Sequence, residues 1–510
     1  MSSVARRFHD ETTHTPYSVR TSGHTLDWDN KPFPFKIYTD APAVALPRDV
    51  DVLAVPTLRA LASPAPGVDR LTLTALTALL YYTAGVTKKK TYPGGGEVLF
   101  RAAASTGALY QTEVYVAAGD VDGLEAGLYH FCPGDFTLRR LRTGDVRAAL
   151  ADAAVDPSIA RRAAIVVLSA IYWRNTWKYQ ARGYRHLFWD SGTMLANALA
   201  VGGALGLAPG LITGFVDDDV NRLLGLDPER EAALELMPVG PAAASGPPPG
   251  DLLALTHDVM PLSSEEVDYP ALREIHHASS LRSRADVVAW RRAIAPPPRE
   301  PRGPLIALPE PMIESRPLGE AIQRRGSSRR FGPPPLAASE LSAALWAATR
   351  PVPADVPSGL VDLYVIVNAV EGVAPGAYAY RPGRGLELVR AGGFRREAAY
   401  LTLEQALGGD AAATIFFLAP LDAVLAAWGE RGYRLVNLEA GIGGGRAYLA
   451  AYGTGFGASG LTFYDADVVR FFSPHAAGLD AIFVTALGRA GSTQNGMLLS
   501  NTIQPPTRRS

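Results

Sequence analysis

The 510-residue chain has a single cysteine, Cys132, and its opposite charges nearly cancel, leaving a formal net charge of -1. One thiol excludes an internal disulfide and a metal site built from several cysteines. The charge balance gives no electrostatic case for binding nucleic acid or an anionic membrane. Residues 1–17 are polar and lack the apolar core of a secretory signal. We therefore expect a globular cytoplasmic protein without a metal site.

Long uncharged runs are also scarce, and residues 194–216 form the one that needs explanation. The run is long enough to cross a bilayer. Glycines and prolines interrupt it, however, and Asp217, Asp218 and Asp219 follow it closely. Because a helix that is apolar on all sides must be buried somewhere, we interpret the run as a helix between two parts of the protein that leads into a loop.

The chain repeats itself at an offset of about 249 residues. The recurring blocks are Tyr115-Val116 and Tyr364-Val365, VDGLEAGLYHF from Val121 and VEGVAPGAYAY from Val370, RGYR from Arg182 and from Arg431, Asp190 with Gly192 and Glu439 with Gly441, and FVDDDV from Phe215 and FYDADV from Phe463. Blocks that recur in one order predict two copies of a domain. Such copies can pack about a pseudo-twofold axis as a homodimer would, so we expect a monomeric pseudo-dimer, or a homodimer of such chains.

Proline- and glycine-rich segments separate the two copies. GPAAASGPPPGD covers residues 240–251 and APPPREPRGP covers residues 295–304. Such compositions resist helix and strand and are typical of spacers, and the stretch between them is expected to pack as a connecting arm. The predicted organisation is an N-terminal domain at 1–240, a linker with this arm at 241–304 and a C-terminal domain at 305–510.

Both copies mix helix and strand patterns. Residues 113–117, 163–168 and 361–368 are rich in strand-forming residues, whereas 71–82 and 339–349 have amphipathic helical patterns. This predicts an α+β fold with helices covering a sheet. The glycines at 441 and 443–445 lack the order of a dinucleotide-binding loop and predict close helix packing.

Segments of both copies resemble flavin-binding enzymes. RGSSRRF, from Arg325 to Phe331, resembles the flavin-phosphate motif of nitroreductases. FRAAASTGALYQTEVYV, GLEAGLYHF and LTHDVMPLSSEEVDYP resemble the streptolysin-type and cyanobactin-type azoline dehydrogenases, a branch of the nitroreductases. The resemblance implies two fused nitroreductase-like domains and FMN as cofactor.

The resemblance also implies which residues hold FMN. In an extended segment, the alternate residues Arg325, Ser327 and Arg329 would face one anion, as a phosphate requires. The first copy lacks this motif but keeps a loop that resembles the lining of the flavin ring. One half-site would hold the flavin phosphate and the other would line the flavin ring. Because the two are complementary, they predict one flavin per chain. The full predicted set is Arg101, Ser105, Thr106, Gly107, Arg325, Ser327, Arg329, Ser459, Gly460 and Arg489.

Lys178 and Tyr179 are the candidate catalytic pair, because a Lys-Tyr pair is associated with azoline oxidation in the family. A buried lysine has a lowered pKa and can act as a base near neutrality. The second copy has Ala427 and Trp428 there, which favours a single catalytic side. The family histidine after RGYR is replaced by Thr193, a departure that puts azoline substrates in doubt.

Other features are given structural roles. We expect the arginines of the two RGYR blocks to pair with Asp190 and Glu439. His276 and His277 are interpreted as a polar surface pair, and Lys88, Lys89 and Lys90 as part of an exposed mobile loop.

The leading functional hypothesis is an FMN-dependent dehydrogenase or oxidase that converts an azoline to an azole in a peptide natural product. Its partners would be a peptide or small-molecule substrate and other enzymes of a biosynthetic complex. The alternatives are an NAD(P)H-dependent nitro- or ene-reductase and a non-catalytic scaffold of such a complex.

Overall fold

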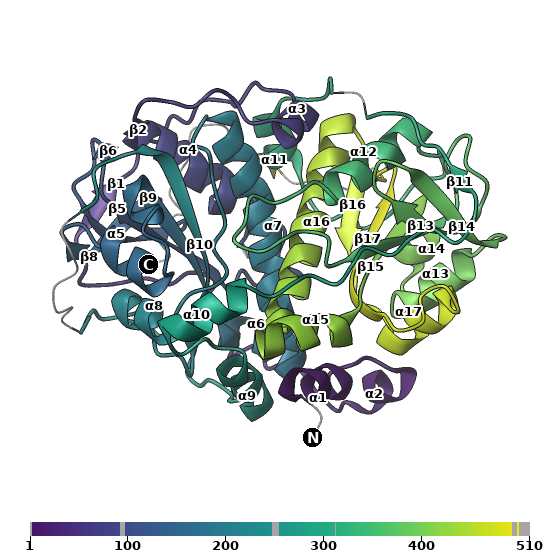
Figure 1. The fold of residues 1–510 in the computed structure, drawn as a ribbon, viewed down its shortest axis with the longest axis horizontal. Helices are drawn as coiled ribbons and strands as arrows, with labels where there is room; N and C mark the ends of the chain where they lie inside the picture. Colours follow the sequence, from purple (N-terminus) through teal and green to yellow (C-terminus); the bar gives the residue numbers. More distant parts are fainter. Residues whose placement is uncertain (1–2, 92–96, 247–253, 312, 492–496, 499–510) are drawn as a thin grey trace.

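A computed structural model of the chain describes residues 3–91, 97–246, 254–311, 313–491 and 497–498. Two halves, each a sheet covered by helices, lie side by side, and the long helices α7 (Gly183–Ala204) and α16 (Gly432–Thr454) run between them (Figure 1). The α+β fold and the duplication predicted from the sequence are therefore confirmed.

Each half contains an antiparallel sheet, and the central strands follow the same order in both. The first sheet is ordered β1 (Ala43–Ala45), β8 (Thr137–Thr143), β7 (Gly127–Cys132), β5 (Thr112–Ala118), β9 (Arg162–Ile171) and β10 (Glu231–Ala242). The second is ordered β11 (Leu305–Ile306), β14 (Gly385–Ala391), β13 (Gly376–Arg381), β12 (Asp362–Val367), β15 (Ala413–Ala419), β17 (Asp480–Gly488) and β16 (Gly457–Gly460). Outside them, β2 (Leu71–Thr72) pairs with β6 (Val121–Asp122), and β3 (Val86–Thr91) pairs with β4 (Glu97–Arg101) and β18 (Met497–Leu498).

The helices also recur in matching positions. The first half has α3 (Thr57–Ala62), α4 (Leu73–Ala84), η1 (Thr106–Ala108), α5 (Arg147–Ala153), η2 (Ile159–Arg161), α6 (Tyr172–Tyr179), η3 (Gln180–Arg182), α7 and α8 (Asp217–Leu224). The second has α11 (Leu318–Arg324), α12 (Ala338–Ala348), α13 (Arg395–Leu401), α14 (Ala406–Asp410), α15 (Leu421–Trp428), η4 (Gly429–Arg431), α16 and α17 (Asp465–Phe472). The N-terminus adds α1 (Val4–Glu11) and α2 (Pro16–Thr21), and the connecting arm adds α9 (Pro270–Ala278) and α10 (Arg284–Arg291).

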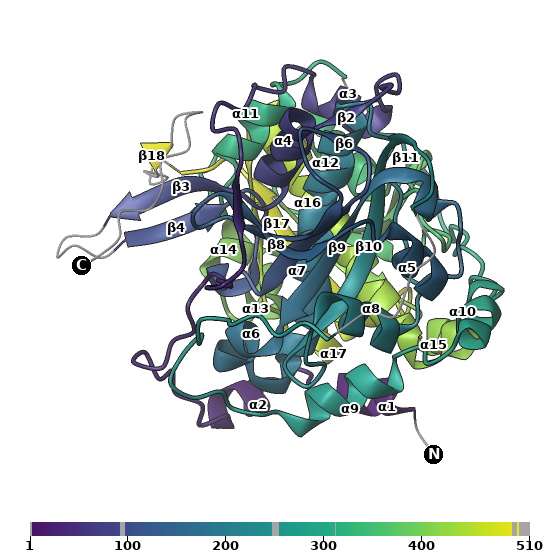
Figure 2. The same ribbon diagram turned by 90° about the vertical axis from the view of Figure 1, so that its left-hand side faces the viewer.

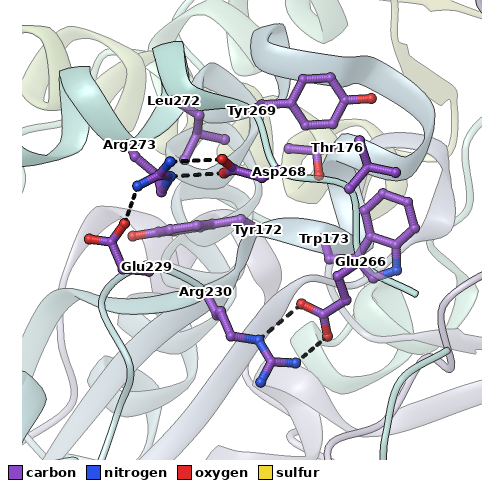
Figure 3. A pocket seen from close by; sticks show the side chains of 11 residues that line it. Tyr172, Trp173, Thr176, Glu229, Arg230, Glu266, Asp268, Tyr269, Leu272 and Arg273 are labelled. Atoms are coloured by element: carbon purple, nitrogen blue, oxygen red, sulfur yellow. Dashed lines mark hydrogen bonds and ion pairs between the residues drawn. The ribbon is translucent and has the colours of Figure 1, made fainter. Parts of the chain in front are cut away.

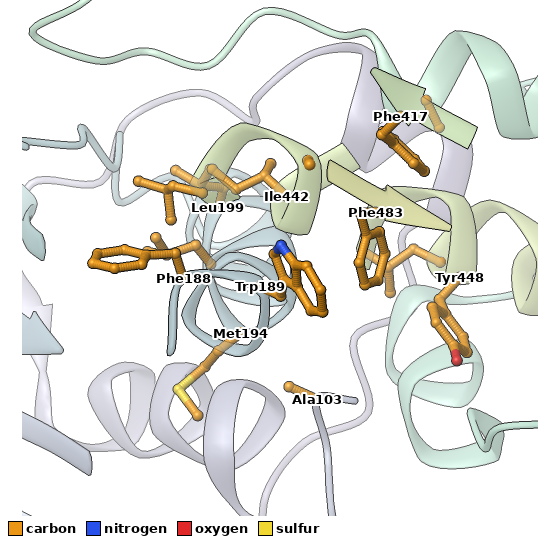
Figure 4. Packing of buried hydrophobic residues seen from close by; sticks show 14 of the residues in the cluster. Ala103, Phe188, Trp189, Met194, Leu199, Phe417, Ile442, Tyr448 and Phe483 are labelled. Atoms are coloured by element: carbon orange, nitrogen blue, oxygen red, sulfur yellow. The ribbon is translucent and has the colours of Figure 1, made fainter. Parts of the chain in front are cut away.

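Helices α7 and α16 cross in direct backbone contact, which glycine makes possible. A Cβ on Gly192 would lie 2.7 Å from the Leu438 carbonyl oxygen, and one on Gly441 would lie 2.6 Å from the Trp189 carbonyl oxygen. Around the crossing the two halves share one apolar core (Figure 4). In it, the ring centres of Trp189 and of Phe483 in the other half lie 5.3 Å apart. The predicted close helix packing is confirmed.

Two buried ion networks join the halves across this interface. Arg182 and Arg185 of the first half bind Asp465 of the second at 3.1 and 2.6 Å. Arg431 and Arg434 of the second half bind Asp217 of the first at 2.6 and 2.7 Å. The prediction that these arginines pair with Asp190 and Glu439 was wrong. Each arginine pair instead neutralises an aspartate at the start of a short helix in the opposite half. The helix is α17 for the first-half arginines and α8 for the second-half arginines.

Two helices cover these networks in equivalent ways. The end of α1 offers the His9 and Thr12 carbonyls to Arg185 and Arg182, at 2.6 and 2.5 Å. The end of α9 offers the His276 carbonyl to Arg434 at 2.9 Å and the Ser279 carbonyl to Arg431 at 3.1 Å. The repeat thus extends to these helices, at an offset of 267 residues between His9 and His276.

This arrangement corrects one interpretation and supports two others. His276 is buried at 2% exposure, so only His277 belongs to the surface pair that we expected. The connecting arm packs on the rest of the protein, and its helix α9 contacts α1 and η4.

The uncharged run at 194–216 begins inside α7 and leads into a loop, as predicted. In the described part of the chain, every helix is too short or too polar to span a bilayer.

The lysines at 88–90 belong to a β-strand and not to a loop. β3 and β4 form a hairpin that projects from the body of the protein (Figure 2), with β18 along the β3 edge. Lys88 and Lys89 of this strand are half-buried, Lys90 is exposed, and Lys89 pairs with Glu97 of β4 at 2.5 Å. The glycines that follow in the sequence, at 94–96, lie outside the described residues.

Candidate functional site

A buried carboxylate holds the first-half loop at residues 105–107. Asp190 on α7 is 4% exposed and accepts hydrogen bonds from Ser105 Oγ at 2.6 Å, Thr106 Oγ1 at 2.7 Å and Gln111 Nε2 at 2.7 Å. The Thr106 backbone N–H also donates to it at 2.8 Å. Burial raises the pKa of Asp190 to about 6, although these donors oppose the shift.

Thr193 holds the same loop from one helical turn farther along α7. Its hydroxyl donates to the Ala104 carbonyl at 2.6 Å. The residue that departs from the family histidine therefore positions the loop through a backbone contact.

Arg325 joins this loop to the second half. Its guanidinium donates to the backbone carbonyls of Arg101 at 2.7 Å, Ala102 at 2.9 Å and Ala103 at 3.1 Å. The Arg101 side chain points into the first half instead, where it donates to the Pro34 carbonyl at 2.5 Å and lies over the rings of Phe35 and Tyr110. The predicted half-sites are thus adjacent, with Arg101 contributing its carbonyl to the contact.

The remaining second-half residues gather around Tyr448 of α16. Its hydroxyl lies 3.1 Å from Ser327 Oγ and accepts the Gly460 N–H at 2.7 Å. Ser459, 1% exposed, precedes Gly460 on β16. Residues 327–328 run beside this strand, where the Ser328 N–H donates to the Ala458 carbonyl at 2.9 Å.

Arg489 is engaged elsewhere. Both of its terminal nitrogens donate to Glu340 at 2.7 Å, and Glu340 also accepts the Ala337 N–H at the start of α12. The guanidinium is thereby neutralised by a carboxylate of its own half.

The predicted catalytic pair meets both half-sites. Tyr179 packs on the loop so closely that a Cβ on Gly107 would lie 2.9 Å from the tyrosine hydroxyl, and Gly107 has a φ of +65°. Lys178 is half-buried, with Nζ 5.4 Å from the centre of the Tyr179 ring. Burial lowers the pKa of Lys178, and the positive charges of Arg329 and Lys31 lower it further. Arg329 of the second half therefore lies near Lys178 of the first.

Lys88 is a further cation beside the second-half motif. From β3 its ammonium donates to the backbone carbonyls of Arg324 at 2.7 Å and Arg325 at 2.5 Å. Burial and the neighbouring Arg325 lower its pKa to about 7. The sequence showed only a run of charges, and only the fold brings this lysine to the motif.

The pseudo-equivalent place on the other side of the axis holds a small cavity. A cavity of about 80 Å³ remains there, lined by Arg350, Glu439 and Arg446, which match Arg101, Asp190 and Asn197 in the repeat. Glu439 accepts the backbone N–H groups of Gly359 and Val361, and burial raises its pKa to about 7. This volume lies below the roughly 300–1,000 Å³ that sites for small ligands usually measure.

Comparison with known proteins identifies the family of this fold. Residues 63–241 and 322–486 match the profile of the Nitroreductase family. The chain belongs to the nitroreductase family. The structure of a nitroreductase from Anabaena variabilis superimposes with a TM-score of 0.78 at 26% identity, and the match covers 96% of this chain and 100% of the other.

Three curated relatives match one part of the chain each. The nitroreductase MJ1384 of Methanocaldococcus jannaschii is 32% identical over 33% of this chain and 81% of its own length. The trifolitoxin-processing protein TfxB of Rhizobium leguminosarum bv. trifolii is 29% identical over 33% of this chain and 47% of its own length. The microcin B17-processing protein McbC of Escherichia coli is 27% identical over 26% of this chain and 50% of its own length. This chain is therefore a nitroreductase-like oxidoreductase related to the two processing proteins, of which the matches span about half.

Members of this family typically bind FMN, and the residues at the junction suit it. A phosphate needs clustered cations and hydroxyl donors, and Ser327 lies between Arg325 and Arg329 with Lys88 close by. Gly107 leaves the loop surface free of a side chain next to Tyr179.

Proposed function

We propose that this protein is an FMN-dependent dehydrogenase or oxidase that converts an azoline to an azole in a peptide natural product. The observation that carries the proposal is the junction at which Lys178 and Tyr179 meet the 105–107 loop and Arg329 of the other half. The relation to two processing proteins supports a peptide substrate. Partner enzymes of a biosynthetic complex belong to the same proposal.

The proposed reaction removes two electrons and two protons from the ring. FMN, when bound, would accept a hydride, and a base must take the remaining proton. Lys178 would serve as that base, because burial and two neighbouring cations favour its neutral form, which can accept a proton at Nζ. Tyr179 would orient the ring, and the loop beneath it would exclude water.

Removing the two cations of the motif should release the cofactor. We expect wild-type protein to carry one FMN per chain, and Arg325→Ala with Arg329→Ala to retain less than about a tenth of it, since each lost charge-assisted hydrogen bond weakens binding by roughly 1.5–3 kcal/mol. The measurement is flavin absorbance per chain after desalting. The matched control is Arg324→Ala with Arg330→Ala, because both arginines are exposed neighbours in the same segment. Equal flavin content in the two double variants would refute the phosphate site.

Lys178→Ala should keep the flavin and lose turnover. We expect a fall of about 10²–10⁴-fold in kcat for azole formation from an azoline peptide under air, the usual contribution of a general base. Lys31→Gln is the companion variant: losing one positive neighbour should raise the pKa of Lys178 and move the rise of kcat/KM to higher pH. Normal turnover in Lys178→Ala would remove the lysine from the mechanism. Bleaching of the flavin by NADPH without azole formation would instead support a reductase.

A further inference from the structure

A cavity in the first half lies apart from the cofactor junction. It measures about 330 Å³ and lies between α6, the turn before β10 and the connecting arm (Figure 3). Tyr172, Trp173 and Thr176 of α6 form one wall, and Val267, Tyr269 and Leu272 of the arm contribute to another. The volume lies within the range of roughly 300–1,000 Å³ that small-ligand sites occupy.

The charged residues of this cavity are already neutralised by one another. Arg273 binds Asp268 at 2.7 Å and also pairs with Glu229, and Arg230 pairs with Glu266 (Figure 3). A charged guest would have to displace one of these partners. An uncharged guest would leave every pair intact.

The polar atoms of the aromatic lining are likewise used within the protein. Tyr172 donates its hydroxyl to the Pro228 carbonyl at 3.1 Å, and Trp173 donates its indole N–H to Ser263 Oγ at 2.7 Å. Tyr269 is hydrogen-bonded to the side chain of Gln180. With these polar atoms engaged, the aromatic lining offers a guest apolar contact, which favours an aromatic group through burial and stacking.

The cavity shares one face of α6 with the candidate catalytic tyrosine. Tyr172, Thr176 and Tyr179 stand at positions i, i+4 and i+7, which form a single stripe on a helix. With a rise of about 1.5 Å per residue, Tyr179 lies about 5–10 Å along the axis from the two cavity residues. An extended peptide advances about 3.3 Å per residue, so this distance corresponds to two or three residues.

The second half does not repeat these features. Tyr172 and Trp173 are matched there by Leu421 and Asp422, just as Lys178 and Tyr179 are matched by Ala427 and Trp428. The aromatic wall therefore occurs on the same helix, and in the same copy, as the candidate catalytic pair.

We propose that this cavity binds an uncharged aromatic side chain of the peptide substrate, two or three residues from the ring that is oxidised. The assignment of the guest to a substrate rests on the proposed function. The cavity would then contribute to KM and to the choice of substrate.

The test is binding of a fluorinated probe, N-acetyl-4-fluorophenylalanine amide, followed by ¹⁹F line broadening on the full-length protein. We expect broadening with wild type, displacement by N-acetyltryptophan amide and none by N-acetylglutamic acid amide. Val267→Trp fills the cavity mouth from a position that is 51% exposed, and should weaken probe binding by at least about tenfold. Val288→Trp, at a 37% exposed valine of the same arm, is the matched control and should bind the probe as wild type does.

Flavin absorbance and the melting temperature of each variant keep the two proposals apart. If the purified protein is colourless and its probe binding is lost in Val267→Trp, the cavity proposal stands and the proposed function is refuted. If the protein is yellow and active but does not bind the probe, or binds it equally well in Val267→Trp, the cavity proposal is overturned and the proposed function stands. If Val267→Trp has a lower melting temperature than wild type, Val267→Phe serves instead and should also weaken probe binding, because its ring would occupy the cavity mouth. Unchanged binding in that variant overturns the cavity as well.

Discussion

Asp465→Asn should lower the free energy of unfolding by about 3–5 kcal/mol, the usual cost of leaving buried charges without their partner. Arg182 and Arg185, 4% and 0% exposed, would then lie inside the protein with no carboxylate. Urea denaturation at neutral pH measures the loss. Asp217→Asn should cost a similar amount, because Asp217 fills the same place in the opposite network.

The same network makes stability depend on pH. Burial alone would raise the pKa of Asp465, but Arg182 and Arg185 outweigh it and hold the pKa below its ordinary value of 3.8. A carboxyl whose pKa is depressed by folding contributes stability above its unfolded pKa and loses it as pH falls through the folded pKa. We therefore expect stability to fall below pH 4 in the wild type and to fall less steeply there in Asp465→Asn.

The control for both measurements is Asp422→Asn. Asp422 pairs with Arg6 at 3.2 Å but is 83% exposed, so its loss should change stability by less than about 1 kcal/mol. An equal effect of Asp422→Asn and Asp465→Asn would show that the networks do not hold the halves together.

Asp190→Asn should release the loop at 105–107 and with it the flavin. The hydroxyls of Ser105 and Thr106 and the Gln111 amide all donate to this carboxylate, and an asparagine NH₂ group would face donors. We expect a loss of about 2–4 kcal/mol of stability and at least about tenfold weaker FMN binding, measured by titration of the apoprotein.

Glu439→Gln is the matched control, since Glu439 is the repeat equivalent of Asp190. It also accepts backbone N–H groups, but it lines the small cavity on the other side of the axis. We expect it to cost stability and to leave flavin affinity unchanged. Equal loss of flavin in both variants would contradict a single flavin site at the Asp190 side.

The pH response of Asp190 has the opposite sign from that of Asp465. Burial raises its pKa from 3.8 to about 6, so the folded protein holds this proton more tightly than the unfolded chain. The contribution of Asp190 to stability is fully present below pH 4 and is lost as pH rises to about 6. Asp190→Asn should remove this dependence between pH 4 and 6.

The duplication and the fold class could be predicted from the sequence, because the recurring blocks are visible along the chain. The adjacency of the half-sites was implied by the resemblance to nitroreductases. The partners of the RGYR arginines could not be predicted. In a duplicated chain an arginine can meet the aspartate of its own copy or of the other, and both choices have the same local pattern. Only packing about the axis selects Asp465 for Arg182 and Asp217 for Arg431.

The parts of the site that the sequence missed are contacts between distant segments. Tyr448 joins Ser327 to Gly460, and Lys88 reaches the carbonyl of Arg325 from a hairpin. Asp190 was noticed as a repeat position, but its donors lie about 80 residues earlier in the chain. Hydrophobic periodicity carries no information on such polar contacts, since they depend on which loops meet after the sheets have formed.

The glycine crossing of α7 and α16 limits how the gene could have diverged. Gly192 and Gly441 each lie against the backbone of the opposite helix, so neither copy can acquire a side chain there without displacing the other. Away from the axis the two copies differ: Lys178 and Tyr179 occur in the first, and Arg325 and Arg329 occur in the second. A library that randomises both halves should therefore tolerate substitutions far from the axis and reject them at these two glycines. Any second mutation that suppresses a substitution at one glycine should lie on the opposite helix.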